Sequence, residues 1–472
     1  MRHRGLIEAL VHTFEFDQVA RGLDLRRGLI AVYGVAEGHK SLVMAAVHRL
    51  SSQPVVVVAS DSEAALRIRA DLEVFFPGEV MYLPPWEFIP YKIYAQSLDN
   101  VNLRVSVWRR LVVDPPAFIV TTAEALIQRV VPLDVWKEAA VYLETGRTYL
   151  LEELTAAFSC LGYERVPLVE VPGQMSVRGG ILDIFPLGEA NPLRLEFDGD
   201  ELVSIRRFSV DDQLSREETK EALVFPAREL VCNGKVMERG IARLREECSR
   251  ISQRLAHGAK TEAGMRLKEK LESYISDLEA GRYPEGCEQF LLYFFPEAGT
   301  ILDHFSHQTV VILDEPKRIE DSIRGKLKDH AGCMSELVAG GVVLPGQVDI
   351  YISGEEVGKK LSCYPAISLS LLPHNSNDFP AQRAVKWESR APGSCFGQLD
   401  RLVEEVSAWR SKRYRCFFFI DTRDRAVRLK EALLSYGIEA PLVKDVRGAV
   451  PEGQILIVSG SLSGGFECPG AR

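Results

Sequence analysis

The chain has 472 residues, of which 46% are hydrophobic, with a formal net charge of −9 at neutral pH. This length predicts three or four domains with sizeable cores, and the acidic balance excludes a global basic field of the kind that binds DNA without sequence preference. No apolar run reaches the roughly 18 to 20 residues of a membrane span, and the stretch Met1–Leu10 lacks the apolar core of a signal peptide. The nine cysteines are scattered without a C-x-x-C pair, which favours neither zinc nor a disulfide framework. We therefore expect a cytoplasmic protein that has no membrane partner.

The first part of the chain, residues 1–133, alternates strand and helix patterns. Short apolar runs predict strands at Gly28–Tyr33, Pro54–Ala59 and Phe118–Thr122. Helical spacing of apolar residues falls between and after them, at Lys40–Leu50, Ser62–Phe76, Asp99–Leu111 and Ala123–Arg129. This order is typical of an α/β fold with a parallel sheet.

One segment of this part is similar to a phosphate-binding loop. Residues 34–41 read GVAEGHKS, close to the pattern G-x-x-x-x-G-K-[ST], in which the second glycine lets backbone amides curl around phosphates. Gly34, Lys40 and Ser41 are in register, but His39 stands where that glycine belongs. We expect the side chain of His39 to crowd the loop, so the sequence predicts a degenerate nucleotide site and no bound cofactor.

A carboxylate pair follows a later apolar strand, Thr309–Glu315. Asp314 and Glu315 end this strand and are similar to the magnesium-binding end of a nucleotide site. Pro316 comes next, and the phosphate loop is not intact. We therefore interpret the pair as a cap for a helix from Lys317 onward, and we predict no metal site and no catalytic residue.

Three arginines, Arg104, Arg109 and Arg110, lie on the predicted helix Asp99–Leu111, behind an aromatic and proline-rich stretch, Met81–Ser97. Aromatic and arginine side chains together can hold single-stranded DNA by stacking. A packed core helix explains the same residues, and we favour that interpretation.

The pattern of residues 173–208 predicts a small antiparallel sheet. We predict strands at Ser176–Phe185, from Leu193, and at Leu202–Phe208, with a tight turn at Asp198–Gly199. The pair Gly179–Gly180 inside the first strand indicates a bulge or a close backbone approach. Alternation leaves one face of the sheet without apolar side chains. The side chains expected there include four arginines, Arg178, Arg194, Arg206 and Arg207, and an ordinary solvated face remains the alternative to a binding face.

The segments VRGGILDIFP and LRLEFDGDELVSIRRFSVDDQ closely resemble the UvrA-binding domain shared by UvrB and the bacterial transcription-repair coupling factor, Mfd. The resemblance implies that UvrA is the partner. It places partner-facing residues at Arg165, Arg178 and Phe185, with Gly179 and Arg194 beside them. Ser176 stands where UvrB has a further arginine, which puts one contact in doubt.

The resemblance to Mfd extends over nearly the whole chain and implies its organisation. It implies a degenerate RecA-like P-loop domain at 1–133 that continues at 210–348, with an inserted UvrA-binding domain at 134–209. Residues 236–279 are expected to form a helical pair that breaks at Gly258. A linker at 349–385 and a small α/β domain at 386–472 complete the expected fold.

The preferred function is therefore a non-catalytic module that recruits UvrA to stalled RNA polymerase. In the family, RNA polymerase, DNA, ATP and magnesium are bound by C-terminal domains, which we expect this chain to lack. The alternative is a part of an ATP-dependent DNA translocase, a hydrolase, with residual nucleotide binding through Lys40, Ser41 and Asp314. A UvrB-like DNA binder is a third possibility, which the acidic balance disfavours.

Overall fold

A computed structural model describes residues 1–24, 28–86, 97–232, 234–256, 261–284, 286–393 and 398–471. Within these ranges the protein is a mixed α/β fold with a seven-stranded parallel sheet, a six-stranded sheet and a three-stranded sheet. None of the helices in the described ranges combines the length and the apolar character needed to cross a bilayer.

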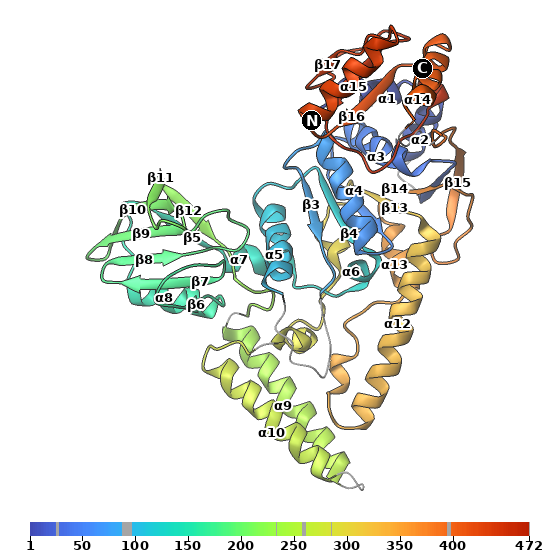
Figure 1. The fold of residues 1–472 in the computed structure, drawn as a ribbon. Coiled ribbons are helices and arrows are strands. Elements are labelled where there is room, and N and C mark those ends of the chain that lie inside the picture. The colour runs from blue at the N-terminus through green and yellow to red at the C-terminus, as the bar shows by residue number, and fades with distance from the viewer. Residues whose placement is uncertain are drawn as a thin grey trace.

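The seven-stranded sheet is the centre of the molecule (Figure 1), and every neighbouring pair in it runs parallel. Its order is β15-β1-β14-β13-β2-β4-β3. The strands are β1 (Leu29–Tyr33), β2 (Val55–Ala59), β3 (Val80–Leu83), β4 (Phe118–Thr122), β13 (Val310–Asp314), β14 (Ala366–Ser370) and β15 (Ala381–Lys386). The strands predicted at 28–33, 54–59, 118–122 and 309–315 are confirmed within one residue at each end.

Both faces of this sheet are covered by helices because its central strands are apolar on both sides. In β2, Val55 and Val57 belong to one core cluster and Val56 and Val58 to the other. The first cluster packs beneath α1 (Arg4–Val11), α2 (Phe14–Asp24), α3 (Glu37–Ser51) and α4 (Ser62–Phe75). The second packs beneath α5 (Leu98–Val113), α6 (Ala123–Ile127), α7 (Leu133–Ala139), α12 (Pro316–Ala339) and α13 (Gly354–Leu361).

A helical pair, α9 (Gly234–Ala256) and α10 (Thr261–Glu279), projects from this domain (Figure 1). The prediction of two helices in this region is confirmed. The predicted break at Gly258 and most of the aromatic stretch before α5 lie outside the described residues.

The six-stranded sheet extends to one side of the central sheet (Figure 1), in the order β11-β10-β9-β8-β7-β6. Its strands are β6 (Glu164–Arg165), β7 (Gln174–Arg178), β8 (Ile181–Ile184), β9 (Leu193–Asp198), β10 (Glu201–Phe208) and β11 (Ser215–Thr219). Helix α8 (Leu151–Cys160) contributes Leu154 and Phe158 to the core on one face of this sheet. A short two-stranded sheet of β5 (Val141–Glu144) and β12 (Glu221–Val224) lies at its base.

Two sequence predictions about this sheet are wrong. The single strand predicted at 176–185 is a hairpin, because Gly179 takes φ of 61° and turns the chain so that Arg178 pairs with Ile181. The boundary predicted at residue 209 cuts the sheet, since β11 pairs with β10. Strand β11 reads SREET, without an apolar residue, so its sequence carries no alternation that would reveal a strand.

The predicted linker at 349–385 is also wrong, because it contains α13, β14 and most of β15. Strand β14 lies between β1 and β13 and is fully buried. The sequence AISLS in β14 is short and half polar, so its burial between two apolar neighbours could not be read from its own pattern.

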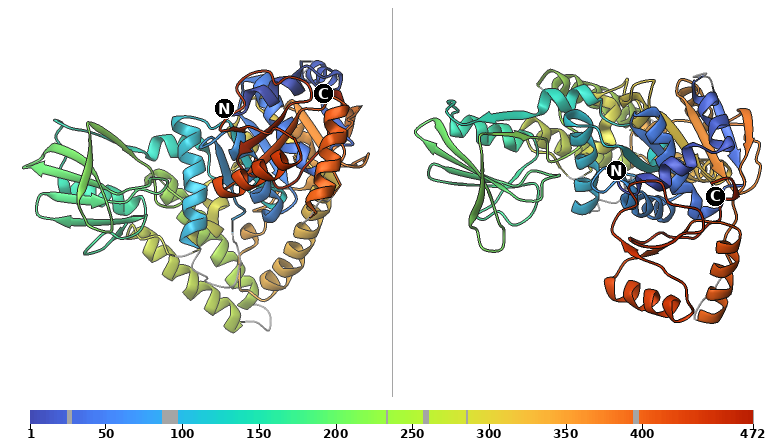
Figure 2. Two further views of the ribbon diagram at one scale, coloured as in Figure 1. Left: turned by 45° about the horizontal axis from the view of Figure 1, so that its top comes forward. Right: turned by 90° about the horizontal axis from the view of Figure 1, so that it is seen from above.

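The three-stranded sheet has the order β16-β18-β17, from β16 (Cys416–Ile420), β17 (Leu442–Val443) and β18 (Ile455–Ser459). Helices α14 (Leu399–Ser411) and α15 (Arg423–Ser435) pack with it, and the unit lies to one side of the central domain (Figure 2). The N-terminus is bonded to this unit, since the amide of His3 donates to Asp445 at 2.7 Å and the amide of Gly5 to the carbonyl of Val446 at 2.8 Å.

Candidate functional sites

The loop after β1 does not form an open phosphate cradle in this structure. The amides of Gly34 and Val35 each donate at 3.1 Å to carbonyls at the end of β14, those of Leu371 and Ser370. The amide of Ala36 donates to the Ser389 hydroxyl at 2.6 Å. Three amides in the region that would line a phosphate nest are therefore bonded within the fold.

His39 lies in the first turn of α3 and is completely buried. Its ring stacks on Phe466, with centroids 4.1 Å apart, and meets Trp387 edge to face. Burial lowers the pKa of His39 to about 3, so the ring is neutral at physiological pH. The side chain that replaces the glycine of the nucleotide pattern is thus used for packing.

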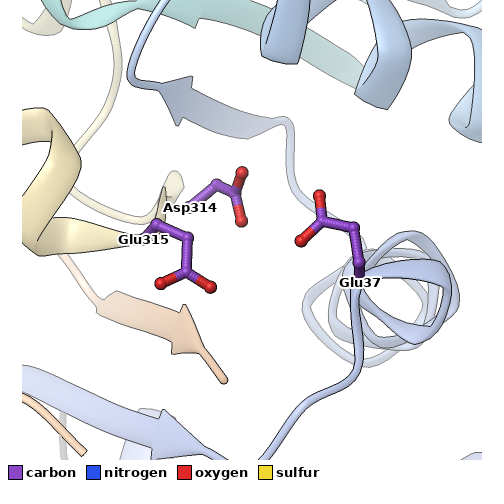
Figure 3. A group of neighbouring side chains, drawn as sticks. All are labelled: Glu37, Asp314 and Glu315. Carbon is purple, nitrogen blue, oxygen red and sulfur yellow. The ribbon is translucent and has the colours of Figure 1, made fainter. Parts of the chain in front are cut away.

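The Lys40 ammonium lies among the three carboxylates that Figure 3 draws. Its Nζ atom is 2.7 Å from Glu37, 2.7 Å from Asp314 and 2.8 Å from Glu315. Burial alone would lower the pKa of Lys40, but the surrounding carboxylates raise it above its usual value. Burial also raises the pKa of the Asp314 carboxyl to about 6, against the opposing effect of Lys40. The lysine is therefore held as a buried cation.

The same carboxylates have the spacing of a metal site, because one oxygen from each lies within 4.8 Å of the others. Three carboxylates suit a hard cation such as magnesium. Here the Lys40 ammonium contacts all three, so the positive charge at their centre is supplied by the protein. Glu315 occupies the N-cap position of α12, as the capping interpretation expects, but its side chain does not cap the helix and bonds to Lys40 and to the Leu371 amide at 3.1 Å instead.

A segment from the end of the chain covers the start of α3, and we call residues 462–468 the C-terminal strap. Ser463 donates to the buried carboxylate of Asp71 from its amide at 2.7 Å and from its hydroxyl at 2.6 Å. Asp71 also accepts a hydrogen bond from Ser41 at 3.2 Å. A Cβ atom added to Gly38 would lie 2.2 Å from the Gly464 carbonyl oxygen, so the two backbones touch.

The strap therefore engages the C-terminal end of the degenerate loop that the sequence singled out. Ser41 shares Asp71 with it, and His39 stacks on its phenylalanine. Sequence reasoning missed this contact, because the partners are far apart in the chain, 392 positions in the case of Asp71 and Ser463. The only local signal was the pair Gly464–Gly465, which permits a close backbone approach.

The second candidate site is the polar face of the six-stranded sheet. The strand registers place one residue from each of five strands in a row across it: Ser176, Asp183, Arg194, Arg206 and Glu218. Asp183 is 1% exposed and accepts hydrogen bonds from Arg178 at 2.7 Å and from Arg194 at 2.8 and 3.0 Å. A buried carboxylate thus orients both arginines.

These two arginines differ in what they offer a partner. Arg194 is 16% exposed, and its guanidinium also lies 4.5 Å above the ring of Phe208. Arg178 is 49% exposed at the end of β7, next to the turn at Gly179. Arg194 therefore belongs to the framework of the face, and Arg178 is the accessible cation on it.

The other predicted contact residues are placed differently. Phe185 is 7% exposed and packs with Val169 and Phe208, so it presents little surface. Arg165 is exposed on the edge strand β6, where it pairs with Met175 and so lies on the opposite side of the sheet from Arg178. Ser176 is buried and donates to the Pro167 carbonyl at 2.9 Å.

Arg207 is not on the polar face, which corrects the sequence prediction. It pairs with Leu193 of the apolar face and donates to Glu189 at 2.7 Å. Glu189 also accepts a hydrogen bond from Arg109 of α5, so one carboxylate joins the two domains. Arg206 and Arg207 are consecutive residues of β10 in regular register with β9, so their side chains point to opposite faces and only Arg206 lies on the polar face.

The three arginines of α5 are all bonded within the fold. Arg104 is 3% exposed and pairs with Glu229, Arg109 pairs with Glu189, and Arg110 pairs with Glu79 at 3.0 Å. This geometry agrees with the packed-helix interpretation.

Residues 141–230 match the family model described as the UvrB interaction domain. This range begins at β5 and includes the complete six-stranded sheet and β12. The matched domain therefore contains the polar face around Asp183.

Curated relatives extend the similarity over most of the chain. The transcription-repair-coupling factor of Bacillus subtilis is 27% identical over 462 residues, which cover 96% of this chain and 38% of the relative. Proteins of the same name from Staphylococcus aureus strain USA300 and Staphylococcus haemolyticus are 24% and 22% identical, each over 93% of this chain and 37% of their own length. The chain thus spans little more than a third of the curated relatives that it matches.

The domain match and the near-complete coverage of this chain show that it is similar to an N-terminal part of a transcription-repair coupling factor.

Proposed function

We propose that this protein recruits UvrA through the polar face of its six-stranded sheet, and that it serves in transcription-coupled nucleotide excision repair without catalytic activity of its own. The observation that carries the proposal is the geometry of Arg178. This side chain is half exposed, yet buried Asp183 holds its guanidinium at 2.7 Å. A cation held in place before binding loses little side-chain freedom when it meets a carboxylate of a partner.

The surroundings of Arg178 suit a protein contact. Gly179 at the adjacent turn has open space around the position of a Cβ atom, so a partner can approach the backbone closely. Arg206 lies in the neighbouring row and is 40% exposed, with carboxylates only at 3.9 Å. Arginine is among the residue types that dominate the energetics of interfaces.

The non-catalytic part of the proposal rests on the loop after β1. Its amides, its lysine and its serine are bonded to other parts of the chain. A nucleotide phosphate would have to displace these partners, including a buried ion pair, which is costly.

Calorimetric titration of the 472-residue chain with UvrA tests the proposal. Wild type is expected to bind, and Arg178→Ala is expected to lose about 2 kcal/mol, or roughly thirtyfold in affinity, as an interface hot spot does. Arg147→Ala is the matched control, because Arg147 belongs to the same domain and is 62% exposed, but lies in the turn after β5. The control is expected to bind as wild type does.

Two results would overturn the proposal. One is that wild type shows no heat of binding to UvrA at low salt. The other is that Arg178→Ala and Arg147→Ala bind equally well, which would place the contact elsewhere in the domain.

A further inference from the structure

A cavity of about 810 Å³ lies between the central domain and the three-stranded unit. Its walls include α1, β16, the loop at residues 447–450, the C-terminal strap, and Leu402 and Trp409 of α14. Figure 2 shows the three-stranded unit against the N-terminal helices, apart from the six-stranded sheet. Cavities of this size at the junction of two domains are where proteins most often hold small molecules.

The walls are mainly apolar and aromatic. Strand β16 divides its side chains between two cores, because Phe418 packs in the core of its own unit while Phe417 and Phe419 face the central domain. Phe417 and Phe419 are only partly buried, and so are Leu462 and Phe466 of the strap. The two domains therefore leave apolar surface between them that their contact does not cover.

Three charged side chains in the lining are bonded to other groups of the protein. Glu8 is neutralised by Arg4 at 3.2 Å and Arg49 at 3.1 Å. Glu467 accepts a hydrogen bond from the indole of Trp409 at 2.8 Å. Arg447 pairs with Asp445 at 3.1 Å and is largely exposed.

Arg415 differs from these three side chains, because most of its guanidinium is left unbonded in the described part of the chain. It precedes β16, is half-buried in the lining, and uses only Nε, which donates to the Val450 carbonyl. Among the residues that the structure describes, its two terminal nitrogens have no partner and no carboxylate lies within ion-pair distance. A buried or half-buried cation without a counter-charge favours an anionic ligand.

We propose that this cavity is a binding site for a flat aromatic anion, a small molecule with an apolar ring system and one acidic group. The rings lie against Phe417, Leu462 and Phe466, and the acidic group accepts hydrogen bonds from the terminal nitrogens of Arg415. The lining includes neither Lys40 and its three carboxylates nor any residue of the polar face around Asp183, so the proposed site is distinct from both.

The probe for this site is 8-anilinonaphthalene-1-sulfonate, whose fluorescence rises in apolar surroundings, compared with its uncharged analogue N-phenyl-1-naphthylamine. We expect the anion to bind the folded 472-residue chain at one saturable site and the neutral compound to bind about tenfold more weakly, the factor of one charge-assisted hydrogen bond. Equal affinities of the two compounds for wild type would overturn the assignment of an anion.

Arg415→Leu is expected to weaken binding of the anion about tenfold and to leave the neutral compound unchanged. Arg401→Leu is the matched control, because Arg401 is exposed on α14, outside the cavity, and likewise makes no ion pair in the described part of the chain. If the two variants weaken the anion equally, the effect is one of net charge, and the proposed role of Arg415 is wrong.

Ala9→Trp tests the cavity itself, since Ala9 lies half-buried on α1 in the lining and an indole there takes up the space for the rings. Saturable binding is expected to disappear. Ala331→Trp, on the exposed side of α12, is expected to bind as wild type does. Retention of the site in a folded Ala9→Trp would exclude the cavity, and should that variant fail to fold, the Arg415 pair of compounds and variants still decides.

Discussion

His39 and Phe466 stack face to face, with ring centroids 4.1 Å apart and planes within 6° of parallel, although 427 positions separate them in the chain. The first residue replaces the glycine of a phosphate loop and the second belongs to the C-terminal strap. The histidine that stands in place of that glycine thus makes a packing contact that joins the three-stranded unit to the central domain.

The first prediction concerns the hold of the strap on Asp71. Ser463→Ala removes the hydroxyl that donates to this buried carboxylate at 2.6 Å. We expect a loss of about 1–3 kcal/mol, because a buried acceptor is left with one donor fewer. Hydrogen exchange measured by mass spectrometry is expected to become faster in the strap and at the start of α3 together.

Ser461→Ala is the control for that experiment, since Ser461 is exposed and comes directly before the strap. Its exchange is expected to match that of wild type. Faster exchange in the strap alone, with α3 unchanged, would show that Asp71 does not couple the two segments.

The second prediction is a pH dependence that comes from His39. Burial lowers its pKa in the folded state to about 3, below the value of about 6.5 in an unfolded chain. The stability that depends on neutral His39 is therefore complete above pH 6.5 and declines as the pH falls toward 3. We expect His39→Phe, which keeps the stacking, to lose about 2 kcal/mol less than wild type between pH 8 and pH 5.

Urea unfolding at the two pH values measures this difference. Burial also lowers the pKa of His304, to about 4, so His304 makes stability fall with pH in the same direction. It is present in both wild type and His39→Phe and therefore does not contribute to the difference between them. The exposed residue His12 supplies the control, and His12→Phe is expected to follow wild type. Parallel pH profiles for wild type and His39→Phe would contradict the prediction.

The third prediction concerns Lys40. Lys40→Met leaves three carboxylates without their shared cation, and one of them, Asp314, is 3% exposed. We expect the free energy of unfolding of the central domain to fall by about 3–5 kcal/mol, as when one partner of a buried ion pair is removed. Lys359→Met, which breaks an exposed pair with Glu355 on α13, is expected to cost less than about 1 kcal/mol in the same urea titration.

The success and failure of the sequence predictions follow from the range of the interactions involved. The apolar strands β1, β2, β4 and β13 could be predicted because each is buried on both faces and is written as a continuous apolar run. Strands β11 and β14 escaped, one because it is an exposed edge strand and the other because its serines are buried by its neighbours. The residue pattern within a strand shows neither that the strand lies at the edge of a sheet nor that its neighbours bury it.

The candidate sites show the same division. The motif residues Lys40, Asp314 and Glu315 could be singled out from spacing, and the structure brings them together. Their bonds to one another, and the exclusion of Phe185 from the surface, depend on long-range packing that spacing does not reveal. Whether a conspicuous arginine is accessible or structural depended on a single buried aspartate five or eleven residues away.

The fourth prediction separates the two glycines of the β7–β8 turn. Gly179 has φ of 61° and free space around a Cβ position, whereas a Cβ at Gly180 would lie 2.8 Å from the Phe197 carbonyl oxygen. Gly179→Ala is expected to cost about 1–2 kcal/mol from left-handed backbone strain, and Gly179→Asn less. Gly180→Ala is expected to disturb the β8–β9 pairing, which hydrogen exchange of the Phe197 amide would report. Equal costs for both alanine variants with unchanged exchange at Phe197 would contradict the turn geometry.

The fifth prediction tests whether Arg194 is structural. Its guanidinium donates twice to Asp183 and covers Phe208, so Arg194→Ala leaves a buried carboxylate with Arg178 as its remaining cation. We expect a loss of about 3–5 kcal/mol in the six-stranded domain, seen as faster exchange in β8 and β9. The neighbouring variant Arg206→Ala is expected to cost less than about 1 kcal/mol, because its carboxylates lie at 3.9 Å near solvent.

The two arginines of the pair then have opposite expected profiles. Arg194→Ala is expected to weaken the domain first and UvrA binding as a consequence, so that stabilising conditions such as low temperature restore part of the binding. Arg178→Ala is expected to leave exchange in β8 and β9 nearly unchanged while it weakens binding at every temperature. If Arg194→Ala keeps wild-type exchange and yet loses binding, Arg194 itself contacts the partner, and the division of roles around Asp183 is reversed.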